Sequence, residues 1–378
     1  MGVTLAVLLF FAIVVGLAAL PLVPGFVELR RRQDTRPLRV VRASEVDVRH
    51  FARSFHAWVE GRLGEAIAAC RASGRTVEGD LPDGTRYAVL PGGAVPTLVP
   101  EGRGGRVCRR VLAACGDLRL PAGALYTLEI FAAGTVEGGE RNVYRALLAD
   151  RDIYLERGSS SLRWLHAGGS VLAREDCRLY GRASADEVLR LEPGCRFERL
   201  HAPTVAFAAP GPPPPQNGER PVLEPKEVRS LVEAAAGRWL VRGECTVPPG
   251  RLVASDLVVT GRLRIGAGAR VAGSVKSHGD VVLEDRACVD GSVTSERTLR
   301  IGRSCRIGGP VIAEGDALVG TGSRLGSAES PTTVSVRRLR IEAGAVAHGT
   351  VWAHAGGEVL AASNGGPAPA HGSEARDG

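Results

Sequence analysis

The segment GRLRIGAGARVAGSV, residues 261–275, decides the fold, because its pattern returns every 18 residues. VLEDRACVDGSV follows at residues 282–293, and LRIGRSCRIGGPV at residues 299–311. The identities change while the apolar positions persist. One apolar column consists of Val247, Ile265, Leu283, Ile301 and Val319, and it continues at Ile341 after a four-residue insertion near residues 327–331. A second column consists of Val271, Val289, Ile307 and Leu325.

The spacing inside each repeat predicts short strands. Every second residue is apolar, which is the side-chain period of a strand, and the glycines between these short segments supply the corners. A repeat of this length cannot bury its inward face alone, so each coil must stack on the next at about 4.8 Å. The sequence therefore predicts a parallel β-helix of about six 18-residue coils over residues 241–360. The chain as a whole is expected to be mainly β.

This region resembles the bactofilins, a bacterial family of polymer-forming cytoskeletal proteins. The resemblance rests on the glycine corners GSV, DGSV and GGPV, on a proline-rich flank and on a polar tail. It implies a right-handed β-helix that polymerises end to end without nucleotide, often beneath the membrane, and that scaffolds envelope enzymes. The family commonly has a Phe near its last rung, whereas no Phe follows Phe207 here, and Trp352 is the candidate for that place.

Left-handed hexapeptide acyltransferases are the alternative, because they are also built on 18-residue coils. Residues 301–326 fit their six-residue period, although Ser277 and Ser295 interrupt it elsewhere. Such an enzyme needs a histidine as general base, and the coils contain His278, His348 and His354. The chain has no GxSxG, HExxH or Walker A motif, and its cysteines have no zinc spacing. The sequence therefore predicts no catalytic, cofactor-binding or metal-binding residues.

The last rung of the β-helix is the predicted surface for self-association. An end rung exposes strand edges that pair with other chains unless they are covered. Val351, Trp352 and Leu360 lie in this rung, with only the tail at residues 361–378 after them. These three residues are expected to join copies into a homopolymer. Arg270, Arg306 and Arg324 share an outward column and predict a basic stripe along the rod.

The N-terminus predicts a membrane anchor. Residues 3–23 carry no charge and are long enough to cross a bilayer as a helix, so residues 1–27 are expected to be a transmembrane segment. Arg30, Arg31 and Arg32 belong to a basic juxtamembrane segment at residues 28–43, which places the C-terminal part in the cytoplasm. The predicted location is the cytoplasmic (inner) membrane, with reduced cysteines. The net charge of +7 is mild and favours a membrane surface over nucleic acid.

The middle of the chain divides into five segments. An amphipathic helix is expected at residues 44–73, with Ser44 as its cap, and a β-rich region at residues 74–207 that begins with a hairpin at Asp83-Gly84. Leu155, Ala173 and Leu191 keep the 18-residue register, as do Cys177 and Cys195, so this region is interpreted as a degenerate β-helix. Residues 208–225 form a proline-rich linker, residues 226–240 a helix, and residues 241–360 the bactofilin-like β-helix.

Together these patterns predict a membrane-anchored cytoskeletal scaffold. The chain is expected to be no enzyme, to self-associate through its β-helix and to organise envelope-associated proteins. A membrane-tethered acyltransferase is the alternative function.

Overall fold

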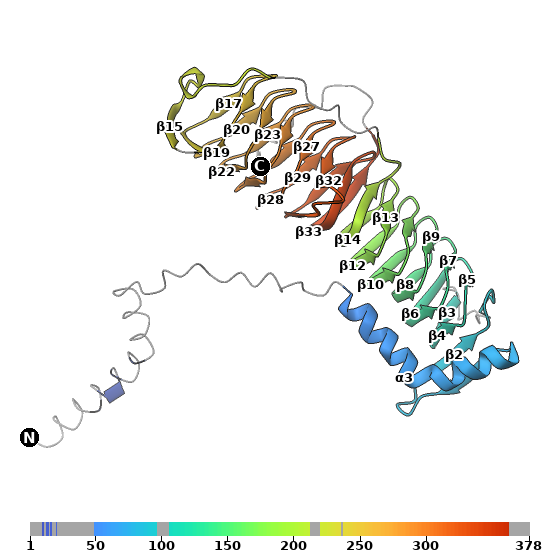
Figure 1. Cartoon of the computed structure of the whole chain (residues 1–378). Helices are drawn as coiled ribbons and strands as arrows, with labels where there is room; N and C mark the ends of the chain where they lie inside the picture. The colour runs from blue at the N-terminus through green and yellow to red at the C-terminus, as the bar shows by residue number, and fades with distance from the viewer. Residues whose placement is uncertain are drawn as a thin grey trace, which may run out of the picture. The chain divides into compact units, whose positions relative to one another are not determined.

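A computed structural model describes residues 49–96, 106–211, 220–235 and 237–362, together with five isolated positions between residues 10 and 20. The chain divides into two compact units, Met1–Asp47 and Val48–Gly378. The second unit is mainly β, with parallel strands wound into a solenoid of about 14 turns (Figure 1). The predicted parallel solenoid is therefore confirmed, and its turns are divided between residues 86–207 and the region from residue 238 to residue 360.

The C-terminal solenoid has the predicted register. Each turn carries three short strands, such as β20 (Leu263–Ile265), β21 (Arg270–Val271) and β22 (Val275–Ser277). The next turns are β23 (Val281–Leu283), β24 (Cys288–Val289) and β25 (Val293–Ser295), then β26 (Leu299–Ile301), β27 (Arg306–Ile307) and β28 (Val311–Ala313). The flanking turns are β17 (Cys245–Val247), β18 (Leu252–Val253) and β19 (Asp256–Val259) before them, and β29 (Ala317–Val319), β30 (Arg324–Leu325) and β31 (Thr332–Val336) after them. β32 (Leu339–Glu342) and β33 (Val346–Leu360) complete the solenoid.

Both apolar columns of this solenoid lie in its core. Ile265 pairs with Leu283, Leu283 with Ile301 and Ile301 with Val319 in parallel register. All members of the two columns are at most 1% exposed. The four-residue insertion bulges out before β31, and Val319 pairs with Ile341 beyond it.

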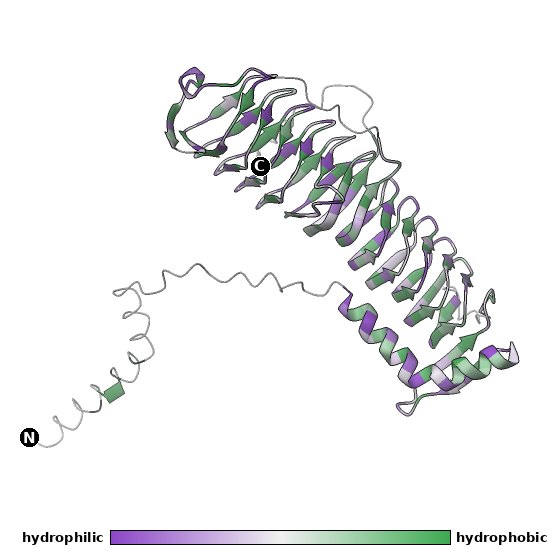
Figure 2. Ribbon diagram, in the orientation of Figure 1, coloured by the Kyte–Doolittle hydropathy of each residue, from purple (hydrophilic) through white to green (hydrophobic). Residues whose placement is uncertain are grey.

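Residues 86–207 form a second solenoid, which confirms that this region is a β-helix. One row of strands consists of β2 (Arg86–Leu90), β4 (Val111–Ala114), β6 (Ala124–Ala132), β8 (Val143–Ala149), β10 (Ser160–Ala167), β12 (Arg178–Ala185) and β14 (Arg196–Phe207). A second row consists of β5 (Leu118–Leu120), β7 (Val136–Gly138), β9 (Ile153–Leu155), β11 (Val171–Ala173) and β13 (Val188–Leu191), and β3 (Arg106–Cys108) pairs with β6. Leu155, Ala173 and Leu191 stack as predicted. Figure 2 shows apolar residues recurring on the strands of both solenoids.

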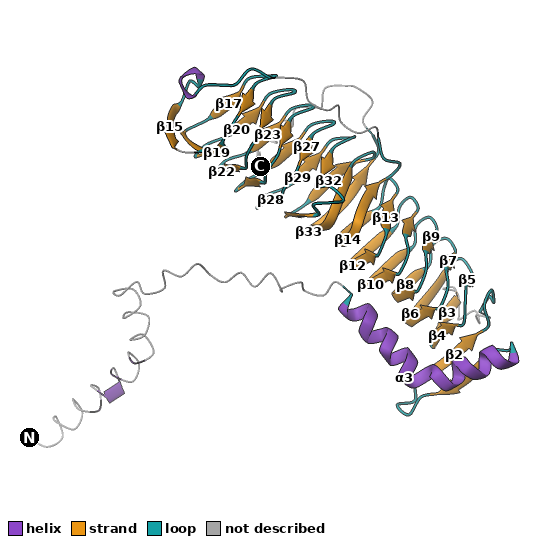
Figure 3. Cartoon of the chain, viewed as in Figure 1, coloured by secondary structure: helices purple, strands orange, loops and turns teal. Residues whose placement is uncertain are grey.

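A hairpin extends the first turn of this N-terminal solenoid, and a helix lies along the outer face of its first turns. The helix α3 (His50–Ser73) packs through Val59, Leu63 and Cys70 on the outer face of the sheet, against Phe131 and Leu148. It is the predicted amphipathic helix, and its apolar face is used for core packing; the predicted cap Ser44 lies outside the described residues. β1 (Val77–Asp80) pairs antiparallel with β2 across the predicted turn at Asp83-Gly84. Figure 3 shows α3 against the orange strands of the first turns.

The predicted helix at residues 226–240 is wrong. Only Pro225–Glu227 forms a short 3-10 helix, η3, and the rest is a hairpin of β15 (Leu231–Ala235) and β16 (Arg238–Arg242). Gly237 turns the chain with φ of 75°, a backbone angle that favours glycine. Trp239 and Val241 are buried while their neighbours are not, which is the strand period of two. The helix was predicted because Val228, Leu231, Val232, Ala235 and Trp239 are spaced as on one helical face.

The two solenoids meet through their last turns. β14 of the N-terminal solenoid pairs antiparallel with β33 of the C-terminal solenoid, with Leu200 opposite Val351 and His201 opposite Thr350. In Figure 1 these strands lie side by side, and the two solenoids extend away from them. The linker before the C-terminal solenoid is described at residues 208–211 and from residue 220 onward. Leu223 is buried, and its N–H donates to the carbonyl of Leu252, so the end of the linker packs on the first turn.

The predicted localisation is corrected by the structure. Among the described residues, no helix is long and apolar enough to cross a bilayer. This finding contradicts the prediction of a single-pass protein of the cytoplasmic (inner) membrane. The predicted anchor at residues 1–27, apart from five isolated positions, lies outside the described residues, as do the basic segment with Arg30, Arg31 and Arg32 and the tail from residue 363 onward.

Candidate functional site

The strand edge predicted to join copies already has a partner within the chain. Val351 is 1% exposed and pairs with Leu200 of β14. Trp352 lies under the Arg199 guanidinium at 4.7 Å, and its ring centroid is 4.1 Å from that of His354. Leu360 is half-buried and pairs with Glu342 of β32. The premise that only the tail covers this rung is therefore wrong, because β14 pairs along it. Val351 and Trp352 belong to a joint between the two solenoids, whereas Leu360 lies just beyond the paired residues.

Two strand edges lie at the outer ends of the double solenoid. β1 pairs only with β2, and β15 only with β16, among the described strands. β1 is the short sequence VEGD, with acidic side chains on its exposed positions and α3 packed nearby. β15 is the sequence LVEAA, and its Leu231 is 65% exposed. The sequence did not reveal this second edge, because residues 231–235 were interpreted as helix.

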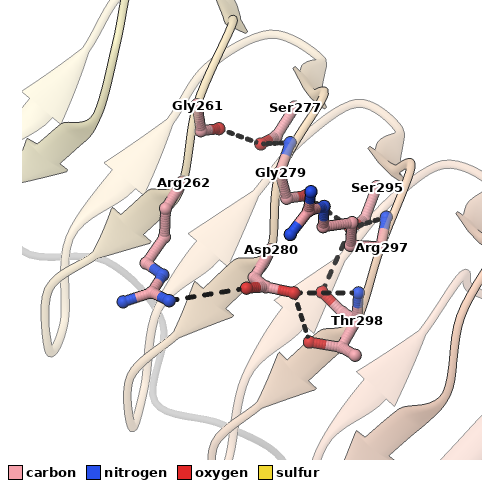
Figure 4. Close-up of polar contacts among 8 residues, drawn as sticks. All are labelled: Gly261, Arg262, Ser277, Gly279, Asp280, Ser295, Arg297 and Thr298. Carbon is pink, nitrogen blue, oxygen red and sulfur yellow. Dashed lines mark hydrogen bonds and ion pairs between the residues drawn. The ribbon is translucent and has the colours of Figure 1, made fainter.

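Polar side chains at the corners of the C-terminal solenoid bind the neighbouring turns (Figure 4). The hydroxyl of Ser277 donates to the carbonyl of Gly261 at 2.6 Å, and the hydroxyl of Ser295 donates to that of Gly279 at 2.9 Å. Asp280 accepts bonds from the N–H and the hydroxyl of Thr298, at 3.2 and 2.7 Å. Each bond joins residues 16 or 18 apart. These serines, which interrupt the hexapeptide pattern, satisfy buried polar backbone groups and stabilise the stacking.

The three histidines of the coils each have a partner on a neighbouring turn or strand. His278 Nδ1 lies 2.7 Å from Glu296 Oε1, and this bond holds the pKa of Glu296 below its usual range. Lys276 Nζ lies 3.6 Å from the same carboxylate. His354 contacts the hydroxyl of Ser335 at 3.0 Å, and His348 Nδ1 lies 3.0 Å from the carbonyl of Pro203. The carboxylate partner of His278 was missed, although its spacing of 18 residues is the repeat itself.

Two further histidines lie in a polar column that crosses the joint. His166 Nδ1 lies 2.9 Å from the hydroxyl of Ser184, and His201 Nδ1 lies 2.9 Å from the hydroxyl of Thr350. Burial lowers the pKa of both histidines; Asp186 opposes this for His166, while Arg49 adds to it for both. The Ser184–His166–Asp186 arrangement resembles a hydrolase triad. Ser184 is only 3% exposed, however, so its hydroxyl is not accessible as a nucleophile.

The predicted basic stripe exists as a column, but its arginines are used within the solenoid. Arg270 pairs with Asp290 at 2.6 Å, and Arg306 contacts Asp290 at 3.7 Å. Arg324 donates to the carbonyls of Gly211 and Gly344. These bonds fix the arginines to the rod and to the start of the linker.

The cysteines lie mostly in the interior. All eight are free and all but Cys115 are buried. Burial raises the pKa of Cys305 to about 12 and that of Cys245 to about 11, so both are neutral thiols at pH 7. Within the described ranges, no group of three or more His, Cys, Asp or Glu side chains is arranged to hold a metal ion.

Comparisons of this chain with models of protein families, with curated proteins and with solved structures give no match.

Proposed function

We propose that the chain is a structural scaffold, a double β-solenoid that associates with a second copy through the free edge of β15. The observation that carries the proposal is the contrast between the two outer ends. One end is the short strand β1, which carries exposed Glu78 and Asp80. The other is β15, whose single acidic residue Glu233 is paired with Arg242; its Leu231 is 65% exposed, and its outer edge pairs with no other described strand. Apolar edges of this kind invite pairing, while charged short edges resist it.

One adhesive end per copy gives a closed assembly. When the same edge of two copies pairs, the contact is related by a two-fold axis and leaves no further edge of that kind. Filaments need a second, different adhesive end, and the rung expected to provide it is paired with β14. The proposed assembly is therefore a head-to-head dimer, which differs from the end-to-end polymer that the resemblance to bactofilins implies.

A non-catalytic role agrees with how the polar side chains are used. Serine, aspartate and threonine groups at the corners bind adjacent turns, and most ion pairs join residues about one turn apart, such as Arg119 with Glu137 at 2.8 Å. A solenoid stabilised by contacts between neighbouring turns presents long outer faces on which partners are arranged. The proposal rests on this geometry.

Sedimentation velocity of the full chain, compared with two single variants, tests the proposal. Leu231→Glu places a charge on the β15 edge and is expected to shift the chain from dimer toward monomer. Trp352→Glu is the matched control, an equal change at a residue that is 39% exposed in the joint, and it is expected to leave the dimer intact. The wild type and both variants share the residues outside the described ranges, so any association through those residues is the same in all three proteins. A monomeric wild type, or loss of association only with Trp352→Glu, contradicts the proposal.

A further inference from the structure

A cleft of about 610 Å³ lies at the joint of the two solenoids. Its walls come from β12 and β14 on one side and from β32 and β33 on the other, with Tyr180, Arg196 and Glu198 facing Arg338 and Arg340. The volume falls in the range of small-ligand sites, about 300–1,000 Å³. The cleft exists only because the last turns of the two solenoids pair.

Two arginines of this cleft have no carboxylate partner among the described residues. Many other arginines of the rod pair with a carboxylate of a neighbouring turn, as Arg264 does with Glu284 and Arg270 with Asp290. Within it, Glu358 is directly opposite Arg340 in register. The ion pair of Glu358, however, is with Arg196 on its other side, at 3.6 Å.

The second carboxylate of the cleft is also in use. Glu198 accepts the backbone N–H of Gly181 at 2.8 Å. Arg338 and Arg340 are both exposed, and neither guanidinium group has a hydrogen bond or ion pair with any described residue. The lining therefore holds three guanidinium groups and two carboxylates, and both carboxylates are already bound.

Like charges are also aligned beside the cleft. Arg178 stands directly opposite Arg196 in the parallel pair of β12 and β14. Like charges directly opposite each other on a sheet are unfavourable, and an anion bound between such side chains removes the repulsion. Guanidinium groups are planar forks that bind phosphate and carboxylate oxygens in pairs, which a halide ion cannot reproduce.

We propose that the cleft binds a small ligand that carries a phosphate or carboxylate group. Arg338 and Arg340 hold the oxyanion, Arg196 approaches it from the opposite wall, and the Tyr180 ring, 40% exposed, offers a flat face to the rest of the ligand. The ligand contacts both solenoids, so its binding stabilises the joint by mass action. The site is independent of the β15 edge and of the proposed dimer.

Isothermal titration and thermal melting of the full chain with inorganic phosphate, pyrophosphate and citrate test the site, each against sodium chloride of equal ionic strength. We expect saturable binding and a higher melting temperature with at least one of the three. Binding of phosphate or pyrophosphate alone identifies a phosphate ligand, and binding of citrate alone identifies a carboxylate ligand. An equal response to chloride contradicts the proposal. Heparin is added as a polyanion probe, and binding of heparin without binding of any small anion also contradicts the proposal.

Arginine variants distinguish the cleft from general surface charge. Arg338→Gln with Arg340→Gln should weaken binding at least tenfold. Arg300→Gln is the matched control, because Arg300 is exposed, lacks a partner among the described residues and lies two turns from Arg340 in the same outward column. Circular dichroism checks that each variant folds, and Arg338→Gln alone serves if the double variant does not. Equal affinities of the cleft variant and the Arg300→Gln control overturn the site.

Discussion

The two solenoids of this chain have nearly the same turn length but fill their interiors differently. In the C-terminal solenoid one interior column is entirely aliphatic: Val247, Ile265, Leu283, Ile301, Val319, Ile341 and Val359. The matching kind of column in the N-terminal solenoid is mixed: Cys108, Tyr126, Tyr144, Ser161, Leu179 and Phe197. A solenoid interior therefore tolerates very different side chains, provided that each turn fills its own layer.

The outlines of the turns differ as well. Strands of the C-terminal solenoid are two or three residues long in its regular turns, with glycines at several corners. In the N-terminal solenoid the strands β6 to β12 of the first row are seven to nine residues long and β14 is twelve, and they bend at irregularities, for example between Ser161 and Trp164 and between Leu179 and Arg182. The irregularity after Ser161 contains no glycine, whereas the one after Leu179 contains Gly181 with φ of 69°. Because a bulge can bend a strand without glycine, glycine marks only some of these corners in the sequence.

Ile301→Asp should have the largest effect on the regular solenoid. The substitution buries an unpaired carboxylate in the aliphatic column, and we expect a loss of several kcal/mol of unfolding free energy. The neighbouring Arg300→Asp places the same group on the exposed face and should change stability by about 0.5 kcal/mol or less. Chemical denaturation measures both. Similar losses for the two variants would show that the register is wrong.

Gly357→Ala should have the next largest effect, at the joint where the two interiors meet. A Cβ atom at this position would overlap the Phe197 ring across the β14–β33 pair. Overpacking of this kind costs about 1–3 kcal/mol. Phe197→Leu in the same chain makes room, so the Gly357→Ala change should cost less in that background. Denaturation of the four proteins of this cycle tests the contact, and strict additivity would contradict it.

The stacked tyrosines of the mixed column provide a smaller comparison. The Tyr144 hydroxyl accepts a bond from Asn142 Nδ2 at 2.9 Å, whereas the buried Tyr126 hydroxyl has no partner among the described residues. Tyr144→Phe leaves the buried amide unsatisfied and should cost about 1–3 kcal/mol. Tyr126→Phe removes an unsatisfied group and should be neutral or stabilising. Melting curves separate them, and a larger loss for Tyr126→Phe would be inconsistent with this packing.

A weaker effect of pH is expected at the polar column of the joint. Burial holds the pKa of His166 and of His201 below the ordinary value of 6.5. Below pH 6.5 the unfolded chain therefore binds protons that the folded chain does not, and stability falls until the pH reaches the folded pKa values. The slope is at most about 1.4 kcal/mol per pH unit for each histidine. His166→Gln with His201→Gln should remove this part of the slope between pH 7 and pH 5. An unchanged slope would refute the assignment.

Most of the C-terminal solenoid was predictable, because its aliphatic residues recur every 18 positions and this period can be read directly from the sequence. The N-terminal solenoid was visible only in its last turns, from Leu155 to Phe197, since Tyr126 and Ser161 occupy inward positions that a hydrophobic column does not suggest. The hairpin of β15 and β16 was missed because the apolar residues from Val228 to Trp239 also have a helical spacing. The β14–β33 joint could not be predicted, since no repeat connects residues 150 positions apart and only the tertiary fold brings them together.

A disulfide cross-link across the joint tests the central claim, that the two solenoids close on each other through β14 and β33, most directly. His201→Cys with Thr350→Cys places thiols on residues that are direct partners in this antiparallel pair, within the reach of a disulfide. After mild oxidation of the full chain, peptide mapping should recover residues 201 and 350 joined within one chain. A pair made with Thr333→Cys in place of Thr350→Cys, one turn further along the solenoid, should cross-link more slowly. Absence of the 201–350 link, or a link formed only between two chains, would contradict the joint.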